Sequence, residues 1–336
     1  MNDGLLYVSY QDTLDLFTAA DALRIVEDVY RMHAEGSVVF ANPPAFKMDV
    51  KELSNHWHVK GCLLKDIPIA GVRMYSYFDD GRRSTVGTLD STRFVVLSDP
   101  RTSKPVAIVD EHWTFALRST AAAVAACKWM TNPDPKVLGL VGVGTMGKTA
   151  LDCLMTMYRF EEVRCTSRRP ETREAFAREY GGRYGLNIVG KESIEEVVRG
   201  ADIIVGGTTS TEIVSREPWV KPGATFLSLA RRELDPAGWA KMDKVVVDSF
   251  DLNMLVPVFR DMIEAGQFSR QQLHAEIWEL VAGTKKGRER REERTLIHTT
   301  GLVTQDVAIA HWVYQRAREA GRGVWLPTAH STMAAE

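Results

Sequence analysis

Residues 137–151 read VLGLVGVGTMGKTAL, and this stretch decides the fold. A continuous apolar run, typical of a strand buried on both faces, leads into Gly142-x-Gly144-x-x-Gly147 and then into a helical pattern. Gly142 permits a tight turn, Gly144 lets the backbone approach a pyrophosphate, and Gly147 lets the helix pack closely on the strand. The amides at the helix N-terminus then face the phosphates. The stretch predicts a dinucleotide site; the alternative is a glycine-rich turn without a ligand.

Short apolar runs alternate with helical stretches on the C-terminal side of this motif. The runs are EVRCT, NIVG, DIIVGG, TFLSL and KVVVDS. Continuous apolar strands separated by helices are typical of a doubly wound parallel sheet of the Rossmann type. Ser193 and Glu196 form a capping box that predicts the start of one crossover helix.

The sequence before the motif follows a different pattern. Apolar residues at spacings of three and four predict one amphipathic helix from Leu14 to His33. Five β-rich runs separated by turn formers predict an antiparallel sheet between Val38 and Val109. Near the C-terminus we expect helices around Gln271–Val281 and Val303–Glu319, separated by the charged run KKGRERREER, which we interpret as solvated. The predicted fold class is α/β, with the Rossmann-type sheet inserted into an α+β domain.

Composition and charge exclude several classes of protein. A chain of 336 residues suits two domains of roughly 100–200 residues each. Its 42 Lys and Arg against 44 Asp and Glu give a net charge of −2, so we expect no nucleic-acid or membrane partner. The four cysteines form no C-x-x-C pair, no apolar run approaches the length of a membrane span, and the N-terminus has acids where a signal peptide is basic. We therefore expect a cytoplasmic protein.

The choice between NAD(H) and NADP(H) depends on the end of the strand after the glycine motif. An acidic residue there binds the ribose 2′-hydroxyl of NAD. This chain instead has Ser167, Arg168 and Arg169, which suit a 2′-phosphate. The sequence favours NADP(H), while NAD(H) remains possible; the alternative is that both arginines are solvated turn residues.

Further contacts to the dinucleotide are expected where other strands end. Thr208 and Thr209 follow the strand DIIVGG at the carboxyl edge of the sheet, where such folds bind ligands, although an ordinary polar turn is the alternative. The expected cofactor-binding residues are Gly142, Gly144, Thr145, Met146, Gly147, Ser167, Arg168, Arg169, Thr208, Thr209, Ser228 and Leu229.

The order of these parts resembles the ornithine cyclodeaminase/mu-crystallin family over nearly the whole chain. The resemblance is carried by LRSTAA at 117–122, VGVGTMG at 141–147 and TGLVTQDVA at 300–308. It implies a homodimer in which residues 1–118 with 302–336 bind substrate and form the interface, while 119–301 bind NADP. It also implies that Arg118 holds the substrate α-carboxylate. An arginine before a helix of small residues suits a bidentate carboxylate clamp; the alternative is an intramolecular ion pair.

Two departures from the family pattern bear on the reaction. Many members have Gly-x-Lys where this chain has Gly71-Val72-Arg73. Arginine keeps the charge and can bind a carboxylate or polarise a carbonyl, but it is a poor proton donor. Cyclodeaminases carry an aspartate in a loop that is shorter here, FLSLARRELD at 226–235, and the aspartate is missing. The resemblance therefore points to the imine-reducing or opine-type branch rather than to ornithine cyclisation.

Reduction of a C=N bond needs a carboxylate clamp and a proton source. For the proton we nominate Lys60 and His58, which share one face of an alternating strand; a polar strand face without a catalytic role is the alternative. We also list Arg73 as catalytic. Lys47 lies near where the family often keeps a substrate-binding arginine, so it joins Arg118 and Arg73 as a substrate contact. The His-x-His pair has no further ligands in view, so we expect no metal.

Together these features predict a homodimeric NADP(H)-dependent imine (ketimine) reductase or amino-acid dehydrogenase. Its substrate would be a small α-imino or α-keto carboxylate. One alternative is an ornithine cyclodeaminase-type ammonia lyase that recycles bound NAD. The other is a non-catalytic NADPH- and ligand-binding protein similar to mu-crystallin, which the missing aspartate favours and Arg118 opposes.

Overall fold

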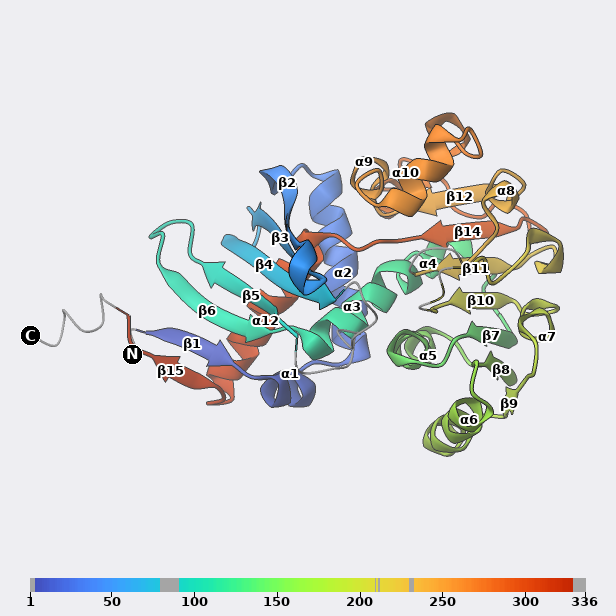
Figure 1. The fold of residues 1–336 in the computed structure, drawn as a ribbon, viewed down its shortest axis with the longest axis horizontal. Coiled ribbons are helices and arrows are strands. Elements are labelled where there is room, and N and C mark those ends of the chain that lie inside the picture. Colours follow the sequence, from blue (N-terminus) through green and yellow to red (C-terminus); the bar gives the residue numbers. More distant parts are fainter. Residues whose placement is uncertain (1–3, 79–90, 209, 211, 230–232, 329–336) are drawn as a thin grey trace, which may run out of the picture. The chain divides into compact units, whose positions relative to one another are not determined.

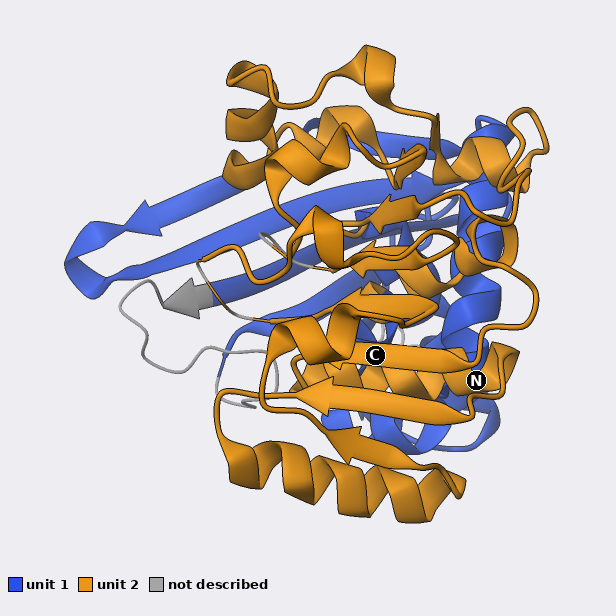
Figure 2. Ribbon diagram, turned by 90° about the vertical axis from the view of Figure 1, so that its right-hand side faces the viewer, with its two compact units in different colours: residues 1–118, 302–336 blue, residues 119–301 orange. Residues whose placement is uncertain are grey.

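The computed structural model describes residues 4–78, 91–208, 210, 212–229 and 233–328 (Figure 1). The chain divides into two compact units (Figure 2). The first unit, drawn in blue, consists of residues 1–118 and 302–336. The second unit, drawn in orange, consists of residues 119–301. Each is described separately below.

The first unit contains a mixed sheet in the order β15-β1-β6-β5-β4-β3-β2. The five β-rich runs predicted from the sequence form its antiparallel part, from β2 to β6. The short strand β1 extends the sheet parallel to β6, and β15 pairs antiparallel with β1. The strands are β1 (Leu5–Val8), β2 (Val38–Val50), β3 (Asn55–Leu64), β4 (Ile69–Phe78), β5 (Arg93–Ser98), β6 (Pro105–Asp110) and β15 (Val324–Leu326).

The long helix α12 (Val303–Glu319) covers one face of this sheet and contacts β3, β4 and β5 (Figure 1). Helix α2 (Ala19–Ala34) packs against α12. The approach of α12 to the sheet is close at Gly71, where an added Cβ would lie 2.6 Å from Cγ2 of Val307. Glycine at this position therefore lets the helix lie directly on β4.

The predicted single helix from Leu14 to His33 was wrong, because it is two helices. Helix α1 (Tyr10–Leu16) ends before Phe17, whose extended backbone separates it from α2. Thr18 caps α2: its hydroxyl accepts from the amide of Asp21, whose carboxylate accepts from the Thr18 amide in return. The ring of Phe17 is buried, and the backbone carbonyl of Phe17 accepts from Nε1 of Trp113 at 3.0 Å. The capping box at Thr18 therefore starts a new helix, although the apolar periodicity continues from Leu14 to His33.

Helix α3 (His112–Val124) begins six residues before Arg118, so that residue does not open the helix as expected. The carboxylate of Asp110 accepts from the amide of His112 at 2.9 Å and also contacts Nδ1 of its ring at 3.0 Å. An aspartate at this position satisfies the free amides of a helix start. Arg118 therefore projects from the interior of a helix rather than from a loop.

The second unit contains an all-parallel sheet in the order β13-β12-β14-β11-β10-β7-β8-β9. The Rossmann-type doubly wound sheet predicted from the sequence is therefore confirmed. The strand β14, which lies between β11 and β12, was not predicted. The strands are β7 (Val137–Val141), β8 (Glu162–Thr166), β9 (Ile188–Gly190), β10 (Ile203–Gly206), β11 (Thr225–Ser228), β12 (Lys244–Val247), β13 (Ala275–Glu276) and β14 (Thr295–His298).

Helices connect these strands, and α7 begins at the capping box of Ser193 and Glu196 as predicted. The predicted helix around Gln271–Val281 is shorter in the structure, because η3 (Arg270–Gln272) and β13 occupy its first half. No helix among the described residues is long and apolar enough to cross a membrane. The helices are α4 (Cys127–Met130), α5 (Thr145–Met157), α6 (Pro170–Tyr184), α7 (Ile194–Val198), α8 (Pro236–Trp239), α9 (Phe250–Asn253), α10 (Pro257–Glu264) and α11 (Ile277–Val281), with η1 (Lys51–Leu53) in the first unit and η2 (Glu217–Trp219) in the second.

The charged run at 285–294 is only partly solvated. Nε of Arg288 donates to the carbonyl of Met130 at 3.0 Å, and the carboxylate of Glu293 is buried. Lys244 at the start of β12 pairs with Glu289 at 2.9 Å. The run therefore anchors the entry to β14, which the alternation of charges alone did not indicate.

Candidate functional site

The glycine motif has the backbone geometry that its spacing predicts. Gly142 has φ +95°, and a Cβ there would lie 2.8 Å from the carbonyl oxygen of Gly207. A Cβ on Gly147 would overlap the carbonyl oxygen of Gly142. In contrast, nothing lies within 4 Å of a Cβ on Gly144, the N-cap residue of α5. The motif is therefore closed at its first and third glycines and open at the second, where a pyrophosphate would approach.

This open position lies where the order of the sheet reverses. On one side of β7 the next strands are β8 and β9, and on the other side they are β10 and β11. The direction in which strands are added to the sheet therefore reverses at β7. The amide of Gly142 donates to the carbonyl of Thr166, the last residue of β8, and the amide of Gly207, directly after β10, donates to the carbonyl of Val141; both distances are 3.1 Å. Ligands of doubly wound sheets bind outside the carboxyl ends of the strands at such a point. Thr208 is half-buried there, while Thr209 lies outside the described residues.

A basic group follows β8. Ser167 is half-buried, whereas Arg168 and Arg169 are exposed, and neither guanidinium forms an ion pair with a residue that the structure describes. Arg169 lines a cavity of about 340 Å³ together with Lys148 of α5, whose ammonium lies 3.3 Å from Glu179. Lys148 directly follows Gly147, and the sequence analysis did not single it out. Its position beside Arg169 makes it a further candidate for phosphate contact.

Ser228 and Leu229 were also expected to contact the dinucleotide. The hydroxyl of Ser228 is buried and donates to Glu233 at 2.9 Å, while it also lies 2.9 Å from Nδ1 of His298. Its side chain is therefore bound inside the second unit, and its backbone carbonyl accepts from the amide of Thr299 at 3.2 Å. Leu229 donates its amide to the carbonyl of Gly206 at 3.1 Å. Both residues remain candidates.

These features fit a nicotinamide dinucleotide. The open backbone at Gly144 and the N-terminus of the 13-residue helix α5 provide a phosphate cradle. The side chains of Thr145 and Met146 are half-buried in the first turn of that helix. The residues that would hold the group are the glycine motif with these two residues, the Ser167–Arg169 segment and Thr208.

The first unit contains a buried group of charged side chains, which we call the arginine cluster: Arg73, Arg93, Arg118, Glu111 and Asp306. Each residue is at most 4% exposed. Nε of Arg73 donates to Oε1 of Glu111 at 2.7 Å, and Nη1 of Arg93 lies 3.6 Å from the same oxygen. Arg118 pairs with Asp306 through its Nε, and its Nη2 lies 3.4 Å from Oδ2. Among these five described residues, three guanidinium groups against two carboxylates leave one positive charge.

The cluster keeps its charge because its members support one another. Burial alone would lower the pKa of Arg73, but Asp306 and Glu111 outweigh this effect and hold the pKa above its ordinary value. The guanidinium carbons of Arg93 and Arg118 lie 4.2 and 4.8 Å from the ring centroid of Phe115. A surplus positive charge in a buried setting is stabilised by a bound anion. The arginine cluster is therefore suited to a carboxylate.

The other predicted catalytic side chains share one face of the sheet with Arg73. Lys60 on β3 lies directly opposite Arg73 on β4. His58 lies opposite Tyr75 on β4 and opposite Lys47 on β2. The structure thus brings Lys47, His58, Lys60 and Arg73 together on neighbouring strands, of which spacing alone had placed only His58 and Lys60 on one face.

His58 is a neutral imidazole at pH 7. Its ring stacks on Tyr75 with the centroids 4.8 Å apart and the planes at 10°. Burial, together with the nearby positive groups, first Lys47, lowers the pKa of His58 to about 3. An imidazolium acid at this position is therefore not available at neutral pH. No group of three or more His, Cys, Asp or Glu side chains in the described ranges is placed to hold a metal ion.

The sequence analysis missed Arg93 and Glu111, and it quoted Asp306 only as part of a motif. Arg93 is the first residue of β5, where its alternation with Val95 and Leu97 predicts the buried face. Glu111 directly precedes α3 and pairs with Arg73, which is 38 positions away. Alternation could have indicated the burial of Arg93, but no local signal indicates which partners meet it.

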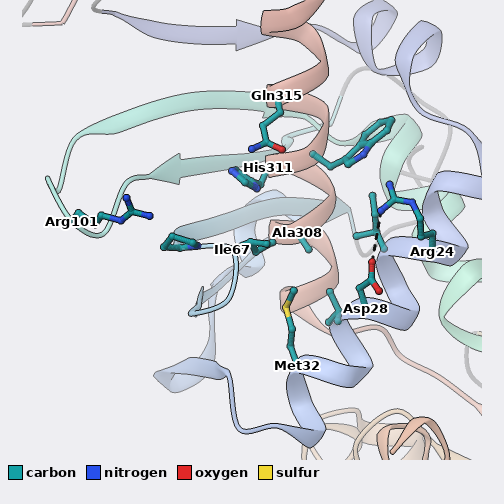
Figure 3. A pocket seen from close by; sticks show the side chains of 12 residues that line it. Arg24, Asp28, Met32, Ile67, Arg101, Ala308, His311 and Gln315 are labelled. Carbon is teal, nitrogen blue, oxygen red and sulfur yellow. Dashed lines mark ion pairs between the residues drawn. The ribbon is translucent and has the colours of Figure 1, made fainter.

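The first unit also has a cavity of about 380 Å³ between α2 and α12 (Figure 3). Arg24 and Asp28, which are one turn apart on α2, point toward one another, with Nη1 and Oδ2 3.7 Å apart. His311 and Gln315 project from α12, and Arg101 approaches from the turn after β5. None of the arginine cluster lines this cavity. It is therefore a separate feature of the outer helical layer.

The comparisons with known proteins agree with this architecture. A Δ1-pyrroline-2-carboxylate reductase of Bacillus cereus is 29% identical over 249 residues, which are 71% of this chain and 75% of that protein. The solved Δ1-pyrroline-2-carboxylate reductase of Thermococcus litoralis, in complex with NADH and L-proline, is 26% identical with a TM-score of 0.86 and covers 96% of this chain and 100% of its own.

An archaeal alanine dehydrogenase, solved as a dimer with bound NAD, is also 26% identical, with a TM-score of 0.87 over 96% of this chain and 99% of its own. The model of the ornithine cyclodeaminase/mu-crystallin family matches residues 8–321. That match spans the glycine motif, the arginine cluster and the crossover between the two units. The chain therefore belongs to the ornithine cyclodeaminase/mu-crystallin family.

Proposed function

We propose that this protein is an NADP(H)-dependent oxidoreductase that reduces the C=N bond of a small α-imino carboxylate, or oxidises the corresponding amino acid. The observation that carries the proposal is the arginine cluster with its one surplus positive charge. The relatives support the reaction class, because they include pyrroline-2-carboxylate reductases and an alanine dehydrogenase.

The substrate carboxylate is held by Arg118, with Arg73 and Lys47 as further contacts. In the structure Nη2 of Arg118 lies 3.4 Å from Asp306, at the limit of a hydrogen bond. A substrate carboxylate offers this fork a second acceptor and brings the net charge of the cluster from one to zero. Because charge-assisted pairs of this kind are directional, binding fixes the orientation of the neighbouring imine carbon.

A reduced dinucleotide held at the glycine motif would supply the hydride for the imine carbon. The imine nitrogen takes a proton, so that the C=N double bond becomes a CH–NH single bond. Lys60 donates this proton, because it carries an ammonium group opposite Arg73 on the neighbouring strand. Arg73 holds its own proton too tightly, since its pKa is raised, and His58 is neutral at pH 7. Arg73 instead positions the substrate carboxylate, and His58 positions the ring of Tyr75 on which it stacks.

The preference for NADP(H) over NAD(H) rests on the end of β8. Arg168 and Arg169 stand where an acidic side chain would bind the 2′-hydroxyl of NAD, and Lys148 adds a third positive charge beside them. The related structures contain NADH and NAD, so the 2′-phosphate preference is a property proposed for this chain alone.

The protein is further proposed to be a homodimer. The face of the first sheet that points away from α12 is apolar and exposed in this chain, which an antiparallel sheet in water normally avoids. By the strand register its exposed large side chains lie on one face: Tyr7, Val39, Phe46, Met48, Val72, Val324 and Leu326, each 37–59% exposed. We call this the apolar sheet face, and a second copy of the chain is its proposed partner.

The proposed reaction is tested by measuring the loss of reduced-nicotinamide absorbance with Δ1-pyrroline-2-carboxylate and with α-keto acids plus ammonia or methylamine. We expect stoichiometric oxidation of NADPH, and no turnover of carboxamide analogues that lack the negative charge. Release of ammonia from ornithine without net change in the cofactor would instead show a lyase. Calorimetric binding of NADPH without turnover of any substrate in the panel would show a binding protein.

A further inference from the structure

The second unit contains a cavity of about 280 Å³ that the proposed reaction does not use. It is lined by residues of α8 and α10, by the segments beside them and by the end of β14. Its walls are mainly apolar and include Leu234, Trp239, Phe259 and Met262. A cavity of about 150 Å³ is large enough to bind benzene in a protein core. This cavity therefore has room for a substituted ring of that size.

One polar side chain is buried in its wall. His298, the last residue of β14, is 3% exposed. Its ring stacks on Phe259 with centroids 5.8 Å apart at 11°, and it meets Trp239 edge-on at 5.0 Å. Nδ1 lies 2.9 Å from the hydroxyl of Ser228, whereas Nε2, on the side of the ring away from Ser228, has no hydrogen-bond partner in the described part of the chain.

The hydrogen bonds of Ser228 fix the tautomer of His298. A serine hydroxyl has one hydrogen, and Ser228 donates it to Glu233 at 2.9 Å. Nδ1 of His298 must therefore be the donor in its contact with the Ser228 oxygen. Burial lowers the pKa of His298 to about 4, so the ring carries only this one hydrogen at pH 7. Nε2 is consequently a bare acceptor.

We propose that this cavity is a binding site for a small, neutral, largely apolar molecule with one hydroxyl group, of the size and shape of a phenol. Its hydroxyl donates to Nε2 of His298, and its apolar body packs between Trp239 and Phe259. A buried acceptor without a partner is costly, and a donor from the ligand removes that cost. Asp235 and Asp261 are also among the lining residues, and their negative charges disfavour an anion in the cavity.

The proposal does not depend on the reaction of the enzyme, so its test is binding. Phenol and toluene have the same number of heavy atoms but differ in the hydrogen-bond donor. We expect ligand-observed NMR titration of the full-length protein at pH 7 to show phenol binding about tenfold more tightly than toluene, which corresponds to about 1.4 kcal/mol. Benzoate, which carries a charge, should not bind.

Two variants locate the binding. His298→Phe keeps an aromatic ring in the wall but removes the acceptor, so it should lose the preference for phenol while still binding toluene. Val258→Trp places a large ring at a half-buried position of the cavity wall and should block both probes. Circular dichroism and urea unfolding of both variants show whether the fold is kept.

Three results would overturn the proposal. The first is equal binding of phenol and toluene by the wild type, and the second is no binding of either. The third is an undiminished preference for phenol in folded His298→Phe or in folded Val258→Trp, which would place the ligand elsewhere. If His298→Phe does not fold, Val258→Trp alone decides whether this cavity is the site.

Discussion

Five buried charges meet in the arginine cluster, and each depends on the others. Removing one partner of a buried ion pair leaves the other uncompensated, which is more costly than the pair itself is worth. Asp306 contacts both Arg73 and Arg118, and Glu111 contacts both Arg73 and Arg93, so each carboxylate is shared by two arginines. A substitution in the arginine cluster therefore changes both anion binding and the free energy of unfolding. Each variant needs one measurement of binding or activity and one of stability.

Arg118→Ala should reduce kcat/KM for the carboxylate substrate, because each hydrogen bond from a charged group is worth roughly 1.5–3 kcal/mol. Arg118→Lys keeps the charge but loses the two-pronged geometry, so its loss should be smaller. Steady-state kinetics measure both, while the dissociation constant of NADPH should stay unchanged. Unchanged kinetics in Arg118→Ala would remove this residue from the substrate site.

The double variant Arg168→Ala/Arg169→Ala should bind NADPH about tenfold or more weakly, since two charge-assisted contacts to the 2′-phosphate are lost. NADH lacks that phosphate, so its affinity should change little. Isothermal titration with both cofactors gives the ratio. Arg178→Ala changes an exposed arginine of α6, the helix whose N-cap residue is Arg169, and is the matched control. An equal loss for NADH and NADPH would contradict the cofactor preference.

The sequence analysis placed the glycine motif and the shared strand face of His58 and Lys60, because both follow from local spacing. The partners of the arginines could not be predicted in the same way. Arg118 and Asp306 are 188 positions apart, and their contact depends on α12 lying across the sheet. Local patterns indicate which side a residue faces but not what meets it there.

Elements with their own sequence pattern were predictable even where they are short, as β9 to β12 are, whereas the short strands β1 and β14 were not. Each of the five strands from β2 to β6 carries its own alternation, whereas β14 has only four residues after a charged run. Strand β1 is equally short, and its position depends on pairing with β6, where Leu6 lies opposite Ala107. Such strands are specified by the sheet they join.

Helices α2 and α12 meet at a histidine that couples stability to pH. Nε2 of His33 lies 2.9 Å from the hydroxyl of Thr304, and burial lowers the pKa of His33 to about 4. The unfolded chain takes up a proton near pH 6.5, whereas the folded chain does so only near pH 4. The contribution of His33 to the free energy of unfolding should therefore be constant above pH 7 and fall as the pH drops from 6.5 to 4.

His33→Gln removes this titration, so the slope of stability against pH should become smaller. Urea unfolding at several pH values measures it. Part of the slope should remain, because the pKa values of His58 and His298 are lowered as well. An identical slope in wild type and variant would show that His33 does not titrate as the structure indicates.

At the scale of the whole molecule, the apolar sheet face governs assembly. Val72 lies near its middle and is 48% exposed. Val72→Glu should convert a dimer into a monomer, since a buried unpaired carboxylate at an interface is strongly unfavourable. Light scattering after size-exclusion chromatography measures the mass.

Leu14→Glu is the matched control for this test, because Leu14 is 38% exposed but lies on α1, outside the apolar sheet face. It should leave the mass unchanged. A monomeric wild type, or a Val72→Glu variant that remains dimeric, would exclude this face as the interface.

The position of α12 near the end of the chain has a consequence for synthesis on the ribosome. Residues 1–118 emerge first, but the helix that covers their sheet and supplies Asp306 follows only after residue 301. Throughout translation of the inserted unit, the nascent β4 and β5 lack their helical cover and Arg118 lacks its carboxylate. A chaperone bound to these strands would bridge the interval, and a transcript truncated before codon 303 would encode a chain that aggregates.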